Sequence, residues 1–87
     1  MTYRIQRVVE PDAIVFVFSG RLNADRSARI GELIAAEAPS RVRLDLADLT
    51  LVDRTGVQFL AHLDATGVEL LHCPDYVRRW IAAKRGS

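Results

Sequence analysis

Four segments of the chain have a hydrophobic pattern typical of β-strands. Residues 3–9 alternate loosely and end at a Glu-Pro-Asp turn, and residues 13–18 form a continuous apolar run that suits an inner strand covered on both faces. Residues 41–46 alternate most clearly, and residues 68–73 form a shorter apolar segment. We therefore predict four strands, of which the first two form a hairpin.

Three other segments have apolar residues at the three- and four-residue spacing of helices. These segments are residues 24–38, 54–66 and 74–85. The first follows Asn23, a favourable N-cap, and precedes Pro39, which stops a helix. The second follows Asp53, another favourable N-cap, and ends at Gly67. The third has Pro74 in its first turn, where a missing N–H is tolerated.

The predicted order of elements is β-β-α-β-α-β-α. Strands separated by helices pair in parallel through right-handed crossovers, and the first hairpin adds an antiparallel edge. We predict an α/β fold with a single mixed, mostly parallel sheet of about four strands and about three helices, in one domain spanning residues 1–87. The residues expected to share its core are Val15, Val17, Val42, Leu44, Leu46, Leu60 and Trp80.

Composition and charge narrow the classes of function. Hydrophobic residues make up 49% of the chain and charged residues 26%, and the 12 basic and 11 acidic residues nearly cancel. No overall field therefore attracts nucleic acid or an anionic membrane. Cys73 is the single cysteine, and the first residues lack the apolar stretch of a signal peptide. We expect a cytoplasmic protein, monomeric or homodimeric, with no nucleic-acid partner and no direct membrane insertion.

Motifs for catalysis, cofactors and metals are weak. The segment around Ser19 has neither a Gly-x-Ser-x-Gly elbow nor a glycine-rich phosphate loop. The groups suited to a soft metal are His62, His72 and Cys73, and the adjacent His72 and Cys73 would point to opposite faces of a strand. We expect no catalytic residue, no cofactor and no metal site.

The C-terminal stretch YVRRWIAAKR, residues 76–85, allows two interpretations. It could be a basic amphipathic helix that contacts a membrane or RNA. Alternatively, Val77, Trp80 and Ile81 pack into the core, and the basic residues form a solvated face. The second interpretation is favoured, because the three apolar residues have the spacing of one buried helical stripe.

The stretch LDLADLTLVDRTG, residues 44–56, places a strand directly before a helix. Asp53 can accept hydrogen bonds from the first turn of that helix, and Gly56 leaves room for another backbone to come close. Arg54 is unexpected, because a cation at the positive end of a helix loses roughly 0.3 to 1 kcal/mol. Its side chain either points into water or is needed for a contact outside the protein.

Three motifs resemble those of STAS domains, a family typified by bacterial anti-sigma-factor antagonists. That family has Gly-x-Leu-Asp at the end of an early strand, then Leu-Asp-Leu, then Asp-Ser-Ser-Gly or Asp-Ser-Thr-Gly opening an apolar helix. The counterparts here, in the same order and with similar spacing, are SGRLN at 19–23, RLDLADLTLVDRTG at 43–56 and VQFLAHL at 57–63.

The resemblance implies a non-catalytic module that binds an anti-sigma or kinase-like protein in bacterial transcription regulation and signalling. It implies that the partner contacts Asn23, Asp53, Arg54, Thr55 and Gly56. In the family, a partner kinase phosphorylates the first serine after the aspartate, but Arg54 occupies that position here. Thr55 matches the second hydroxylated position and is a secondary candidate for phosphorylation. Because Arg54 removes the main acceptor, we expect binding that is constitutive, or governed by expression or by modification of the partner. The alternative is a STAS-like structural subunit of a transport or signalling assembly, as in lipid ABC transporters.

Overall fold

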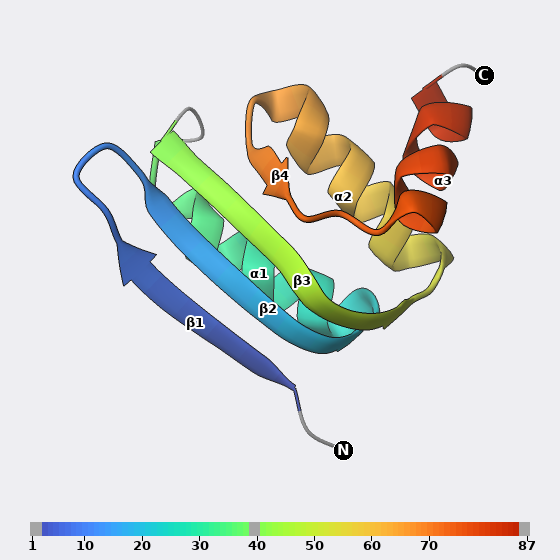
Figure 1. The fold of residues 1–87 in the computed structure, drawn as a ribbon, viewed down its shortest axis with the longest axis horizontal. Helices are drawn as coiled ribbons and strands as arrows, with labels where there is room; N and C mark the ends of the chain where they lie inside the picture. The colour runs from blue at the N-terminus through green and yellow to red at the C-terminus, as the bar shows by residue number, and fades with distance from the viewer. Residues whose placement is uncertain (1–2, 39–40, 86–87) are drawn as a thin grey trace.

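A computed structural model describes residues 3–38 and 41–85 of the chain, without the side chains of residues 84 and 85. In these residues, four strands form one sheet in the order β1-β2-β3-β4, and three helices accompany it (Figure 1). The elements follow the predicted order. Their bounds are β1 Arg4–Val9, β2 Ile14–Leu22, α1 Ala24–Ala35, β3 Val42–Val52, α2 Arg54–Thr66, β4 Glu69–Leu71 and α3 Asp75–Arg85.

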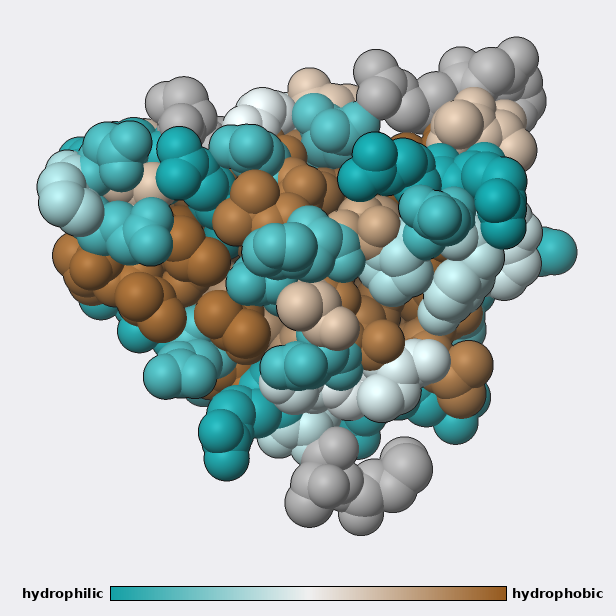
Figure 2. Space-filling model, in the orientation of Figure 1, coloured by the Kyte–Doolittle hydropathy of each residue, from teal (hydrophilic) through white to brown (hydrophobic). Residues whose placement is uncertain are grey.

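The sheet is mixed and mostly parallel, which confirms the predicted fold class. β1 pairs with β2 in antiparallel orientation, whereas β2 with β3 and β3 with β4 are parallel. Figure 1 shows α1 behind β2 and β3, with α2 and α3 on the β4 side. On the face of the molecule seen in Figure 2, hydrophobic and hydrophilic residues are interspersed. In the parts of the chain that the model describes, no helix combines the length and the apolar character needed to span a bilayer.

The hydrophobic core lies between the sheet and the helices, and it contains most of the predicted residues. Those confirmed in it are Val42, Leu44, Leu46 and Leu60. On β2, however, the alternation places Phe16 and Phe18 in the core instead of the valines. Val17 is half-buried, and Val15 is buried outside this cluster, beside its cross-strand neighbours Val8 and Arg43. The expectation was wrong by one residue because a continuous apolar run does not reveal which alternate set faces the helices.

The prediction that Trp80 belongs to the core is wrong. Its side chain is 50% exposed, whereas Val77 and Ile81 on the same helix are buried in the core cluster. Val77 and Ile81 are one helical turn apart, and it is through these two side chains that α3 packs against the core. Trp80 projects to one side of this narrow stripe.

Both inner strands are longer than their hydrophobic patterns predict. β2 continues to Leu22 and β3 continues to Val52, beyond the expected ends at residues 18 and 46. The pairing shifts register between Val17 and Ser19 and again between Gly20 and Arg21. At these irregularities the alternation of buried and exposed residues is interrupted although the strands stay paired. A prediction based on alternation alone therefore places the strand ends too early.

Two further boundaries differ from the expectation. α1 ends at Ala35, while Pro39, the expected stop, lies outside the described residues. β4 ends at Leu71, and the next residue, His72, adopts a left-handed conformation with φ 55°. His72 and Cys73 are therefore not neighbours on a strand, and the chain turns at this point toward α3.

The position of Leu44 in the core yields a stability prediction. Leu44 is fully buried, and we expect Leu44→Ala to lower the free energy of unfolding by about 2 to 5 kcal/mol. Leu51 is on the same strand but 57% exposed, so Leu51→Ala should change stability by less than about 0.5 kcal/mol. Urea titration of both variants measures the difference. Equal losses would show that the two faces of β3 have been assigned incorrectly.

Candidate functional site

The candidate site lies where β2 and β3 end. Leu22 and Val52 are the last paired residues of the two parallel strands. Asn23 and Asp53 follow immediately, and each precedes a helix. Figure 1 shows this edge at the lower right, where α1 and α2 begin. The parallel pairing therefore brings together two segments that are thirty positions apart in the sequence.

Asn23 and Asp53 act as the N-caps of α1 and α2, as predicted. The Asn23 side-chain Oδ1 accepts a hydrogen bond from the Arg26 backbone N–H at 3.0 Å. The Asp53 carboxylate Oδ1 accepts one from the Gly56 backbone N–H at 2.8 Å. Each bond satisfies one of the N–H groups that a helix leaves unpaired in its first turn.

Gly56 lies where α2 approaches the ends of both strands. The Asp53 N–H donates to the Leu22 carbonyl oxygen at 3.2 Å, which ties the start of α2 to β2. A Cβ atom on Gly56 would lie 3.0 Å from that same oxygen and 2.5 Å from Val52 Cγ2. The absence of a side chain is therefore required for this close approach, which confirms the interpretation made from the sequence.

Arg54 and Thr55 occupy the first turn of α2, and both are exposed. Within the described residues, neither side chain makes a hydrogen bond or an ion pair. The fold places both beside the cap residue Asp53. Their side chains are free to contact a second molecule.

Arg26 is a residue of this edge that the sequence pattern did not single out. It is 9% exposed, its Nη1–H donates to the Arg21 carbonyl oxygen at 2.8 Å, and its guanidinium lies 4.4 Å from the centroid of the Tyr3 ring. Such a cation–π contact is stabilising when the cation is removed from water. The sequence carries no signal for it, because Tyr3 and Arg26 meet only after β1 pairs with β2.

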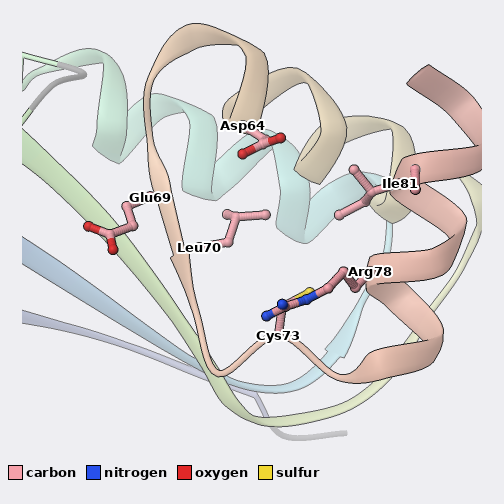
Figure 3. Close-up of a pocket in the computed structure, with 7 residues that line it drawn as sticks. Asp64, Glu69, Leu70, Cys73, Arg78 and Ile81 are labelled. Carbon is pink, nitrogen blue, oxygen red and sulfur yellow. The ribbon is translucent and has the colours of Figure 1, made fainter. Parts of the chain in front are cut away.

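A separate hollow of about 350 Å³ lies between α2, β4 and α3 (Figure 3). Arg78 reaches over Cys73 within it, and Leu70 and Ile81 provide apolar lining. Burial raises the pKa of the Cys73 thiol, and the opposing effect of Arg78 is smaller. The thiol therefore stays protonated at neutral pH, and Cys73 packs as a small residue of the core cluster.

Metal-binding side chains do not gather in the described parts of the chain. Among those residues, no group of three or more His, Cys, Asp or Glu side chains could hold a metal ion. His72 Nδ1 instead lies 3.1 Å from Asp45 Oδ1, on the neighbouring strand β3. This contact joins the segment after β4 to the sheet.

Comparison with known proteins identifies the fold. No family model matches the chain, and no curated protein matches it. A STAS-domain antisigma-factor antagonist from Rhodobacter sphaeroides is 16% identical with a TM-score of 0.55, over 80% of this chain and 86% of that one. The crystal structure of Mglu is 19% identical with a TM-score of 0.65, over 80% of this chain but 19% of Mglu. The chain therefore has the STAS fold, which by itself does not establish a function.

The close approach at Gly56 yields a prediction with an internal control. We expect Gly56→Ala to lower the free energy of unfolding by about 1 to 3 kcal/mol, because the added methyl group meets strand backbone. Gly31 in α1 has room, since its added Cβ would lie 3.6 Å from Phe59 Cε1. Gly31→Ala should therefore stabilise the protein by about 0.5 to 1 kcal/mol. Denaturant titration distinguishes the two, and a neutral Gly56→Ala would contradict the described geometry.

Proposed function

We propose that the protein is a single non-catalytic interaction module that binds a regulatory protein partner, of the anti-sigma-factor or kinase-like kind, in bacterial signalling. The contact surface is the edge formed by Asn23, Asp53, Arg54, Thr55 and Gly56. Binding takes place in the cytoplasm and does not depend on a phosphorylation switch at this edge. The similarity in fold to an antisigma-factor antagonist supports the class of partner.

The observation that carries the proposal is the difference between two arginines that each lie in the first turn of a helix. Arg26 and Arg54 both lie in the first turn of a helix, where the helix dipole disfavours a cation. Arg26 is compensated by a carbonyl oxygen and an aromatic ring. Arg54 has no such partner within the described residues, and its first turn holds no acidic residue, whereas that of Arg26 holds Asp25. An acidic group on a bound protein would supply the missing interaction.

The roles of the five residues differ. Asn23 and Asp53 fix the two helix starts through their side chains, and Gly56 allows the helix to approach the strands. These three residues define the shape of the edge. Arg54 and Thr55 supply the exposed groups that a partner would meet. Because the shape is set by short hydrogen bonds from side chains to the backbone and by close packing at Gly56, the surface is organised before the partner arrives, which lowers the entropy lost on binding.

The substitution of arginine for an acceptor serine leads to a prediction about phosphorylation. Arg54 has no hydroxyl group, and Thr55 lies in the first turn of α2. We expect no stoichiometric phosphorylation when the protein is incubated with its kinase-like partner and ATP. Intact-mass measurement tests this expectation. A complete shift by one phosphoryl group that maps to Thr55 would show that the switch is retained.

Reversing the charge of Arg54 tests the binding surface itself. We expect Arg54→Glu to leave stability unchanged or to raise it by up to about 1 kcal/mol, because a carboxylate suits a helix N-terminus. Affinity for the partner recovered by pull-down should fall by several-fold to about a hundredfold, since an attraction is replaced by a repulsion.

The control for this experiment is Arg41→Glu. Arg41 is exposed immediately before β3, at the opposite end of that strand from Arg54, and the substitution changes the net charge by the same amount. Thermal melting and calorimetric titration are measured for both variants. Unchanged affinity of a fully folded Arg54→Glu variant would place the partner contact elsewhere, and so would equal losses for both variants.

A further inference from the structure

The outward side of α3 carries two exposed aromatic side chains. Tyr76 is 42% exposed and Trp80 is 50% exposed, and Arg79 between them is also exposed. Residues three and four positions apart lie on the same side of a helix, so these three form one surface, called here the α3 outer face. Val77 and Ile81 on the adjacent side are buried in the core. Core packing therefore does not account for either aromatic residue of this face.

The same helix concentrates positive charge. α3 contains four of the 12 basic residues of the chain and one of its 11 acidic residues, which gives the helix a net charge of +3. The remaining residues carry a net charge of −2. The near-neutral total therefore conceals a local asymmetry, of the kind associated with binding to an anionic surface.

We propose that the α3 outer face adsorbs to a membrane surface that contains anionic lipids. Tryptophan and tyrosine side chains prefer the headgroup region, where the ring is partly removed from water and its polar atom remains hydrated. Arg79, the basic residue that lies on this face beside the two aromatic rings, attracts anionic headgroups. Val77 and Ile81 stay in the core, so α3 lies on the surface and does not enter the hydrocarbon.

A lipid surface fits this face better than a folded partner does. The hollow beside α3 is lined by Arg78 and Ile81, and none of the three residues of the outer face contributes to it. The outer face is the convex side of a single helix. Headgroups can rearrange around such a surface. Their negative charge also complements α3, whose net charge of +3 is the highest among the helices and strands of the described residues.

Trp80 is the single tryptophan of the chain, so its fluorescence reports directly on the proposed contact. The full chain is titrated with vesicles of phosphatidylcholine, with and without phosphatidylglycerol. We expect a blue shift of the emission and partitioning at least about tenfold stronger with the anionic lipid, weakening as salt is added. An unchanged spectrum with anionic vesicles would overturn the proposal. Equal partitioning into neutral vesicles would do the same.

Two variants with the same change in net charge test the face in vesicle co-flotation. Arg79→Glu should lower partitioning by roughly tenfold or more, whereas Arg41→Glu should lower it by less than about twofold. Equal losses would overturn the assignment to α3.

Melting curves establish that both variants are folded. The variant Trp80→Phe, which keeps an aromatic ring, should retain most of the binding. A single-stranded RNA that shifts the Trp80 emission where vesicles do not would assign the face to nucleic acid instead.

Discussion

The hydrogen bond from the Asp53 N–H to the Leu22 carbonyl oxygen joins the end of β3 to the end of β2, and the start of α2 depends on it. It holds α2 so close to the strands that position 56 has no room for a side chain. The Asp53 side chain then binds the Gly56 N–H, so one residue fixes both the strand end and the helix start. The cap of α2 and the exposed position of its first turn belong to this one arrangement.

This geometry determines which charged side chains are stable at the edge. Two helices begin side by side, and their positive ends make any cation in a first turn unfavourable. Arg26 is accommodated because the ring of Tyr3, the residue before β1, lies against its guanidinium and because the carbonyl oxygen of Arg21, near the end of β2, accepts a hydrogen bond from it. No comparable group lies against Arg54 in the described part of the chain, so its compensation is expected from a second molecule.

The fold class and both helix caps could be predicted from the sequence, because they depend on local patterns: alternation, helical spacing, and Asn or Asp before a helix. Gly56 was predictable for the same reason. The strand extensions to Leu22 and Val52 were not, since irregular pairing hides the period. The exposure of Trp80 was also missed. Periodicity shows which residues of a helix could be buried, but it does not show how much of the helix surface the neighbouring elements cover. The contact of Arg26 with Tyr3 could not be predicted either, because it forms only when β1 pairs with β2.

Native-state hydrogen exchange tests most directly whether this edge is a preformed surface. The account predicts that the Asp53 and Gly56 amides, whose acceptors are the Leu22 carbonyl and the Asp53 carboxylate, exchange only when the whole protein unfolds. Their opening free energies should then match that of the fully buried Leu44 in β3. Exchange at a small fraction of the global free energy would show that the start of α2 opens locally. The claim that the edge is rigid and organised before binding would then be contradicted.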